Sequence, residues 1–175
     1  MSGLFAIPLT GLKEGRHVYD FDIDKEFFEE FEESEIKDSS IKVKAIIIKR
    51  SAHMELELDL KGRVLIMCDR CLGDYWQDIE STNKMLLKFG KDWDEVDDEV
   101  ITIPADESSL DLSQIIYEFV NLALPIQRIH YESAEGESEC DPIMLEKLDE
   151  HTIDEEENID PRWKELGKLK DRLKN

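Results

Sequence analysis

Hydrophobic and polar residues alternate through the central part of the chain, a pattern typical of strands that bury one face. Residues 53–60 (HMELELDL) place Met54 and three leucines on one face and three carboxylates on the other. Residues 41–50 (IKVKAIIIKR) combine alternation with β-branched side chains. Shorter or less regular versions of the pattern occupy residues 5–9, 17–23, 63–68, 75–89 and 100–104. Successive strands with short connections predict a meandering antiparallel sheet or a partly closed barrel.

Two connections within this pattern are open to interpretation. Gly62 suits a turn or a bulge, so residues 53–68 form either a hairpin or one long bent strand. Both alternatives place Cys68 at the end of a strand. Residues 91–100 (KDWDEVDDEV) are so acidic that they predict a solvated loop before the chain returns to the sheet.

Apolar residues spaced by three and four positions predict one principal helix within residues 110–125 (LDLSQIIYEFVNLALP). Asp111 can cap its start, Gln114 stands at the capping-box position, and Pro125 ends it. The face that packs on the sheet is expected to consist of Leu112, Ile115, Ile116, Phe119 and Ala123.

Three further segments have helical features. Residues 24–31 (DKEFFEEF) begin with an Asp cap and are long enough for one or two turns. Residues 142–151 (PIMLEKLDEH) predict a short helix inside an acidic, loosely patterned region. Near the end of the chain, Pro161 suits a first helical position. The amphipathic helix predicted there has its apolar face at Trp163, Leu166, Leu169 and Leu173.

Together these elements predict an α+β fold with a packed central helix and a C-terminal amphipathic helix. A chain of 175 residues is long enough for one core of ordinary size and a tail. The organisation that we expect is a core in residues 1–130, an acidic loop or linker in 131–160 that can close on a metal, and a helix in 161–175.

The overall charge narrows the choice of partners. Asp and Glu number 43 against 22 Lys and Arg, which gives a formal net charge of -21. Such a surface argues against a nucleic-acid binder that uses its whole exterior, although a local basic face can still contact RNA. It also suits a basic partner, such as a ribosomal protein that has not yet met its RNA.

The N-terminal segment and the cysteine count bear on the compartment. The first residues lack the positive region and long apolar core of a secretory signal, and no run is long enough to cross a membrane. Three cysteines, an odd number, argue against a disulfide framework. The sequence therefore predicts a protein of the reducing cytoplasm.

Cys68 and Cys71 form a CxxC pair within VLIMCDRCLGDYW and admit three interpretations. A redox pair of the thioredoxin type needs a helix N-terminus among alternating strands and helices, which this pattern does not provide. A structural zinc ion needs two further ligands. In the third interpretation Cys68 is a small buried apolar residue, Cys71 is half exposed and Cys140 is a surface thiol.

The further ligands for zinc are sought in the segment QRIHYESAEGESEC, where His130 and Cys140 stand ten positions apart in a polar, glycine-containing loop. A Cys3His site built from Cys68, Cys71, His130 and Cys140 would be closed and structural. It would hold this loop on the sheet and compensate for the weak hydrophobic pattern of the loop.

The ordered set CDRCLGDYW, DLSQIIYEFVNLALP, a polar segment and DPRWKELGKL resembles the YceD family, the proteins named for accumulation of large-subunit ribosomal RNA. The resemblance covers most of the chain, from FAIPLTGLKEG to the DPR segment. Many family members carry a further cysteine or histidine cluster after the LALP-like helix, which supports zinc ligation by His130 and Cys140. This chain departs from the cysteine-rich members, because it has one histidine and one cysteine there.

The resemblance implies a bacterial cytoplasmic, or plastid-derived, role in making or stabilising 23S ribosomal RNA and in assembling the large subunit. Genes of the family commonly neighbour one for a small zinc-ribbon protein of the large subunit, which implies action in the same assembly step. The expected partners are the large-subunit RNA precursor or a basic ribosomal protein, with no membrane and no small-molecule substrate. A module that binds protein alone is the alternative.

Direct contact with RNA needs basic residues that gather in one place. Around the central strands and the CxxC pair, the candidates for phosphate contact are Lys42, Lys44, Lys49, Arg50, Lys61, Arg63 and Arg70. Tyr75 or Trp76 can stack on an unpaired base. A second basic group near the end of the chain is Lys164, Lys168, Lys170, Arg172 and Lys174. In the alternative, which the net charge favours, these cations balance nearby acids and the aromatic residues belong to the core.

The sequence contains no motif that indicates an enzyme. It has no phosphate-binding glycine loop, no GxSxG elbow and no HExxH. Carboxylates are so numerous that a pair of them carries no information about acid and base catalysis. Cys71 with His53 or His130 imitates a cysteine nucleophile, but no further motif supports that chemistry. A non-enzymatic role is therefore expected.

Overall fold

The computed structural model describes residues 3–97, 99–131 and 138–152. Its chain divides into two compact units, Met1–Glu139 and Cys140–Asn175. The described part of the first unit contains two sheets and two helices, and that of the second contains the helix α3 (Pro142–His151). This mixture of strands and helices confirms the α+β class.

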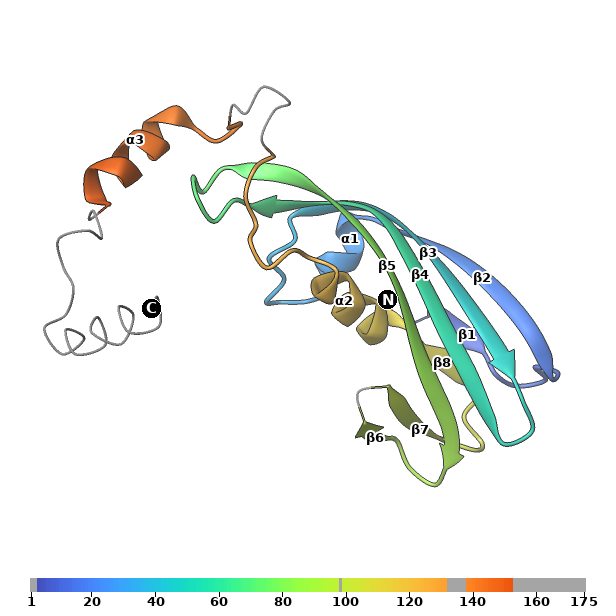
Figure 1. The fold of residues 1–175 in the computed structure, drawn as a ribbon. Helices are drawn as coiled ribbons and strands as arrows, with labels where there is room; N and C mark the ends of the chain where they lie inside the picture. The colour runs from blue at the N-terminus through green and yellow to red at the C-terminus, as the bar shows by residue number, and fades with distance from the viewer. Residues whose placement is uncertain (1–2, 98, 132–137, 153–175) are drawn as a thin grey trace, which may run out of the picture. The chain divides into compact units, whose positions relative to one another are not determined.

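Six strands of the first unit form the main sheet, in the order β2-β3-β4-β5-β7-β6 (Figure 1). Their bounds are β2 (Gly15–Ile23), β3 (Asp38–Lys49), β4 (His53–Met67), β5 (Asp74–Gly90), β6 (Asp94–Asp97) and β7 (Val100–Pro104). All neighbouring strands are antiparallel except β5 and β7, which run parallel. The antiparallel meander is confirmed, and the sheet does not close into a barrel, because β2 and β6 are its open edges.

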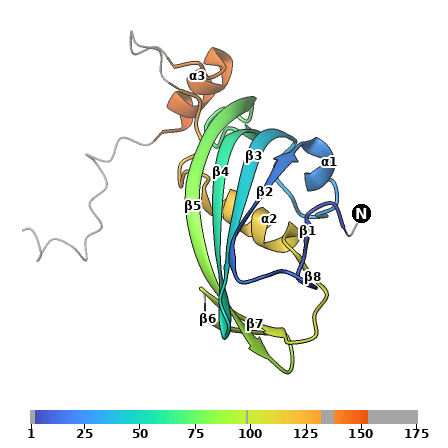
Figure 2. The same cartoon turned by 90° about the vertical axis from the view of Figure 1, so that its right-hand side faces the viewer.

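The other elements of the first unit lie on one side of the main sheet (Figure 2). They are the two-stranded sheet of β1 (Ala6–Pro8) and β8 (Ser109–Asp111), the short helix α1 (Lys25–Phe28) and the helix α2 (Ser113–Leu122). Aromatic rings connect these elements, since the ring of Phe27 in α1 lies 5.0 Å from that of Phe5, and the ring of Phe28 lies 6.2 Å from that of Tyr117 in α2. The core therefore sits between this side of the sheet and the elements that cover it.

Strict alternation in β4 decides which face of the sheet is buried. Met54, Leu56, Leu58 and Leu60 are each at most 1% exposed. The neighbouring strand keeps the same pattern, because the buried Ala45 of β3 stands opposite Leu58. Burial of one such large side chain stabilises the fold by about 1.5–3 kcal/mol. A slip of one residue would expose the whole row and is therefore strongly disfavoured.

Gly62 lies inside β4, which continues from His53 to Met67 without a turn. Of the two alternatives left by the sequence, the single long strand is therefore confirmed. A Cβ atom added at Gly62 would stand 2.1 Å from the Ser40 carbonyl oxygen and 2.6 Å from the Ile41 Cα. Glycine is needed here because the backbone of β3 passes too close for any side chain.

The start of α2 differs from the prediction. Its N-cap is Leu112, whose side chain offers no hydrogen bond. The Asp111 carboxylate acts from one residue earlier, where it accepts hydrogen bonds from Ser113 N at 2.9 Å and from Ser113 Oγ at 2.6 Å. Gln114 does not complete a capping box, because its amide donates forward to Glu118 Oε1 at 2.7 Å. The capping box was therefore a wrong prediction, whereas Asp111 does satisfy a backbone donor of the first turn.

The end of α2 agrees with the prediction, since the helix stops at Leu122, ahead of Pro125. Its buried side chains are Ile115, Ile116 and Val120. Phe119 and Ala123, expected on the same buried face, are only partly covered. For Phe119 the reason is that this side of α2 borders an open groove.

Residues 91–100 form more than the predicted solvated loop. Asp94–Asp97 make up β6, which pairs antiparallel with β7 and has an irregularity between Glu95 and Asp97. The return to the sheet at Val100–Pro104 is confirmed as β7. Asp94 and Asp97 remain exposed on this edge strand, where charge discourages pairing with another strand.

The helix predicted at residues 142–151 is confirmed as α3, whose N-cap Asp141 accepts a hydrogen bond from Ile143 N at 2.9 Å. The short helix predicted after Asp24 is confirmed as α1. The C-terminal helix predicted at 161–175 lies outside the described residues. Within the described part of the chain, no helix is both long enough and apolar enough to cross a membrane.

We expect Gly62→Ala to lower the free energy of unfolding by about 1–3 kcal/mol, because the added methyl group must push β3 away from β4. Urea titration of this variant beside the natural protein measures the difference. The control Lys61→Ala, on the exposed face of the same strand, should change stability by less than about 0.5 kcal/mol. An unchanged unfolding midpoint for Gly62→Ala would contradict the close approach of the two backbones.

Candidate metal centre

The CxxC pair lies in the loop between β4 and β5, which we call the cysteine loop (residues 68–73). Cys68 N donates to the Gly73 carbonyl and Leu72 N donates to the Cys68 carbonyl, both at 2.9 Å. Leu72 has a left-handed backbone with φ of 61°, an uncommon conformation for a residue with a side chain. This tight turn buries both thiols, since Cys68 is 0% and Cys71 is 5% exposed.

The surroundings of the Cys68 sulfur favour its thiolate form. Burial opposes ionisation, but the backbone N–H groups of Cys71, Arg70 and His130 donate to the sulfur, and the pKa of the thiol falls to about 6. The Arg70 nitrogen lies 3.4 Å from Sγ. A thiolate with N–H donors already arranged around it is the form in which cysteine binds a metal ion.

The segment that follows α2 is held against the cysteine loop. Asp69 N donates to the Arg128 carbonyl at 2.7 Å, and Arg128 N donates to Asp69 Oδ2 at 3.0 Å. The Arg128 guanidinium also pairs with the carboxylate of Glu35. These bonds place His130 Nδ1 3.4 Å from Cys71 Sγ. Two of the predicted ligands are therefore in direct contact.

Two tyrosines lie beside the imidazole of His130. The Tyr75 ring centre is 5.0 Å from the imidazole and 6.3 Å from the Tyr131 ring. Tyr131 Oη accepts hydrogen bonds from Gln77 Nε2 at 2.9 Å and from Asp78 N at 3.2 Å. Burial raises the pKa of Tyr75, so the phenol beside the imidazole stays neutral.

The ligand atoms of Cys68, Cys71, His130 and Cys140 all lie within 4.8 Å of one another. Three thiols and an imidazole are a common donor set of structural zinc sites. With zinc–sulfur bonds of about 2.3 Å, the ligand atoms of a tetrahedral site stand about 3.7 Å apart. The atoms of this group need to approach by about 1 Å at most, so the Cys3His group could hold a metal ion.

These positions discriminate among the three interpretations of the CxxC pair. A thioredoxin-type thiolate requires a position at the start of a helix. The CxxC pair lies instead between two antiparallel strands. The packing interpretation is wrong in two details, because Cys71 and Cys140 are each 5% exposed. For metal binding the structure offers a candidate group, because four potential ligand atoms lie within 4.8 Å of one another.

The seven basic residues predicted to contact RNA are interrupted by carboxylates. Lys42, Lys44, Lys49, Arg50, Lys61 and Arg63 lie on or beside β3 and β4. Arg70 lies in the cysteine loop. The Lys61 ammonium pairs with Glu80 at 3.0 Å, and the Arg50 guanidinium pairs with Glu55 at 2.6 Å. Lys42, Lys44, Lys61 and Arg63 therefore share the exposed face of the sheet with carboxylates. Lys49 lies on the other face, because it stands opposite the buried Met54.

Further carboxylates and an aromatic ring flank other members of this group. Lys44 of β3 stands opposite Asp20 on β2 and opposite Asp59 on β4. The Arg63 guanidinium carbon lies 4.7 Å from the ring centre of Trp76. RNA contact through the seven residues stays a prediction.

Sequence reasoning missed the residues that hold the ligands in place. These are Asp69, whose N–H and carboxylate both bond to the backbone of Arg128, and Tyr131, which fastens the His130 segment to β5. Their partners are separated by more than fifty positions in the sequence, so periodicity could not reveal them. The one local signal was Gly73, two residues after the second cysteine, which is consistent with a tight turn.

Comparison with known proteins gives two matches. The sequence model described as "Large ribosomal RNA subunit accumulation protein YceD" matches residues 56–170. A Bacillus subtilis (strain 168) protein described as "Uncharacterized protein YlbN" is 28% identical over 134 residues, which cover 75% of this chain and 74% of that protein. No solved structure matches the chain.

The purified protein is expected to contain about one zinc ion per chain. Cys71→Ser and His130→Ala should each release zinc and lower the melting temperature, because structural zinc stabilises the folded state. Elemental analysis and thermal melting measure the two effects. His53→Ala, which removes a partly exposed histidine of β4, should retain the metal. Natural protein that is metal-free, and whose melting does not change with added zinc or chelator, would contradict the site.

Cys140→Ser tests the fourth ligand by itself. We expect zinc affinity to fall by at least roughly 100-fold, since even the loss of a group that only orients a ligand costs about 10–100-fold. Competition with a chromophoric chelator measures the affinity. Glu139→Gln, at the neighbouring position, is the matched control and should bind zinc normally. Equal zinc affinity of Cys140→Ser and the natural protein would show that Cys140 is not a ligand and that the site has three protein ligands.

Proposed function

The chain belongs to the YceD family of large ribosomal RNA subunit accumulation proteins, and from this membership we propose that it is a non-enzymatic factor for 23S ribosomal RNA accumulation. In this proposal it assists assembly of the large ribosomal subunit in the bacterial cytoplasm. The metal centre maintains the structure, and the surface engages a partner. The partner is a basic ribosomal protein, and precursor ribosomal RNA is the second candidate.

The match over residues 56–170 is the observation that carries this proposal. It includes most of β4, the cysteine loop, β5 and α2. The candidate metal ligands and the principal helix therefore belong to the part of the chain that the family shares. A role in large-subunit assembly is the simplest function that a protein named for large ribosomal RNA accumulation can have.

The charge of the chain supports a basic protein as the partner. A net charge of -21 attracts a basic protein and repels the phosphates of RNA. Attraction of this kind acts over a Debye length of about 8 Å at physiological ionic strength. Ribosomal proteins that must avoid premature contact with RNA are partners of the required charge.

Zinc at the Cys3His group would have a structural role. Four protein ligands fill the tetrahedral positions and leave none for water or substrate, as in closed structural zinc sites. Cys68 and Cys71 come from the cysteine loop, whereas His130 follows α2. A metal on these residues would fix the end of the β4–β5 hairpin to the segment behind α2. The proposed role of the site is therefore to stabilise the fold and not to catalyse a reaction.

Direct RNA binding is the second candidate because of one local arrangement. The guanidinium of Arg63 lies over the ring of Trp76 on the exposed side of the sheet. An arginine beside an aromatic ring can contact a phosphate while the ring stacks on a base. The ion pairs of Lys61 and Arg50 with carboxylates count against a larger RNA surface.

A cysteine-dependent enzyme is the least supported alternative. Cys71 does contact His130, but its side chain is only 5% exposed, so a substrate would have little access to the sulfur. His53, the other suggested base, begins β4, at the far end of that strand from Cys68.

We expect cells depleted of this protein to accumulate less 23S ribosomal RNA, and an affinity-tagged copy to restore it. The tagged protein should retain a basic large-subunit protein after ribonuclease treatment. Mass spectrometry and RNA sequencing of the retained material, with and without ribonuclease, measure both partners. Depletion without any change in 23S ribosomal RNA would contradict the proposed function.

The same preparation distinguishes the two partners. Recovery of precursor 23S RNA that falls steeply with salt, with every protein lost after ribonuclease, would indicate direct RNA contact. In that case charge reversal at Lys42, Lys44 and Arg63 should abolish RNA recovery. Reversal at Lys13, Lys25 and Lys88, three exposed lysines outside the group, is the matched control.

A further inference from the structure

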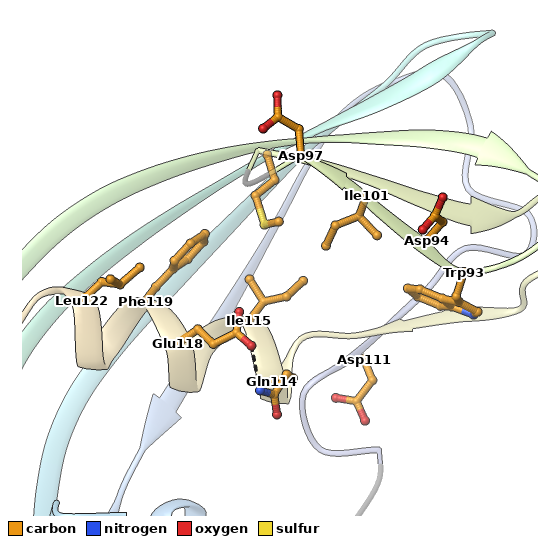
Figure 3. A pocket seen from close by; sticks show the side chains of 11 residues that line it. Trp93, Asp94, Asp97, Ile101, Asp111, Gln114, Ile115, Glu118, Phe119 and Leu122 are labelled. Atoms are coloured by element: carbon orange, nitrogen blue, oxygen red, sulfur yellow. Dashed lines mark hydrogen bonds between the residues drawn. The ribbon is translucent and has the colours of Figure 1, made fainter.

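A groove with a volume of about 1060 Å³ lies between α2 and the hairpin of β6 and β7 (Figure 3). Its apolar lining is Met85, Trp93, Ile101, Ile115, Phe119 and Leu122. The Trp93 side chain is 50% exposed and that of Leu122 is 76% exposed. Two large apolar side chains that remain in water beside a groove are typical of a binding surface.

Four carboxylates surround this apolar lining, and we call the whole surface the acidic groove. They are Asp94, Asp97, Asp111 and Glu118. The described lining of the groove contains no lysine, arginine or histidine. Asp111 and Glu118 accept hydrogen bonds from the neutral groups of Ser113 and Gln114, which leave their negative charge uncompensated.

The end of α2 adds to the negative potential. Leu122, the last residue of the helix, lines the groove. The carbonyl end of a helix carries a partial negative charge, which favours a cation placed beside it. The last turn of α2 contains no basic side chain, so this position is open to a lysine or arginine of a partner.

We propose that the acidic groove binds a lysine- and arginine-rich peptide segment of a partner protein, with apolar side chains of that segment seated among Trp93, Phe119 and Leu122. The inference rests on the proposed function, since it gives a binding surface to the basic partner. The apolar lining provides the contact area, and the carboxylates accept the cations on either side. Such a division into an apolar centre and a polar rim is common in protein interfaces.

The charges favour this occupant over two others. A second copy of the chain, docked on the same surface, would bring the four carboxylates of each protomer together and is disfavoured by repulsion. RNA would bring phosphates to a surface that already carries four negative charges. Of these three occupants, only a basic segment is attracted to the acidic groove.

The test uses the full chain and a fluorescein-labelled synthetic peptide of lysines with leucines at helical spacing. Fluorescence anisotropy should show binding that weakens as salt rises, because the rim charges are exposed. Tryptophan emission should shift to shorter wavelength on binding, and Trp93→Phe should remove most of this shift. A second peptide, with serines in place of the leucines, should bind at least roughly tenfold more weakly.

Two double variants, each of which removes two negative charges, show where the peptide binds. Asp94→Asn/Glu118→Gln should weaken peptide binding by roughly tenfold. Glu32→Gln/Glu33→Gln, at two exposed positions away from the groove, should weaken it by less than about twofold. Leu122→Ser should also weaken binding, and its melting temperature shows that the helix is intact. Equal weakening by the two double variants would overturn the proposal, as would equal binding of the serine peptide.

Three other results would each assign the groove to a different occupant and would overturn the proposal of a basic partner protein. One is self-association of the natural chain that Leu122→Ser abolishes. Another is a shift of the Trp93 emission by a single-stranded RNA oligonucleotide and not by the peptide. A third is peptide binding that appears only in Lys168→Gln/Lys170→Gln/Arg172→Gln, which would assign the groove to the chain's own basic residues.

A cell-based comparison distinguishes failure of this inference from failure of the proposed function. Depleted cells that carry Asp94→Asn/Glu118→Gln should recover less 23S ribosomal RNA than cells with Glu32→Gln/Glu33→Gln. Full recovery with both variants would overturn the groove as the partner site and leave the proposed function in place. If the natural protein itself does not affect 23S ribosomal RNA, the proposed function fails, whatever the peptide measurements show.

Discussion

The continuous pairing of β4 with β5 is the constraint on which the rest of the first unit depends. It runs without interruption from His53 opposite Lys88 to Met67 opposite Asp74. Because every second side chain of β4 is buried, this register cannot slip without exposing the core row. The pairing also fixes where the hairpin turns, and therefore where Cys68 and Cys71 are presented. At its other end, β5 carries the parallel strand β7.

The candidate metal centre and the acidic groove thus lie toward opposite ends of β5. The cysteine loop precedes Asp74, whereas the groove takes Met85 from the later half of the strand. This separation allows one end to be tightened by a metal ion while the other stays open to a partner. In this picture α2 connects the two, since its side chains line the groove and the chain that follows it carries His130.

Charge is distributed differently over the two surfaces that a partner could use. On the outer face of the sheet, cations and carboxylates face each other across neighbouring strands, as Lys61 does with Glu80. Pairs of this exposed kind contribute little stability, about 0–1 kcal/mol each, but they cancel the local field. In the groove, Asp111 and Glu118 accept hydrogen bonds from neutral groups, and the described lining residues include no cation. The negative charge of the chain therefore produces a stronger local field at the groove than on the outer face of the sheet.

The sequence by itself determined the features that depend on local periodicity. Alternation placed the strands and their buried face, helical spacing placed α2, and the CxxC pair marked a site that needed more ligands. His130 and Cys140 could also be proposed as metal ligands from the sequence, because the chain has few other cysteines or histidines. The strands, the helix and the CxxC pair could be read because each depends on residues within a few positions of one another, whereas the two further ligands were inferred from their residue types.

Only the tertiary structure decided the features that depend on distant residues. Gly62 could be a turn or part of a strand until the backbone of Ser40 was found beside it. The acidic run 91–100 was read as a loop, because the partner that makes part of it a strand, β7, acts through pairing and not through composition. The contact of His130 with Cys71 depends on the Asp69 and Arg128 hydrogen bonds, which join segments far apart in the chain. Periodicity describes one element at a time, whereas a site and a groove arise where several elements meet.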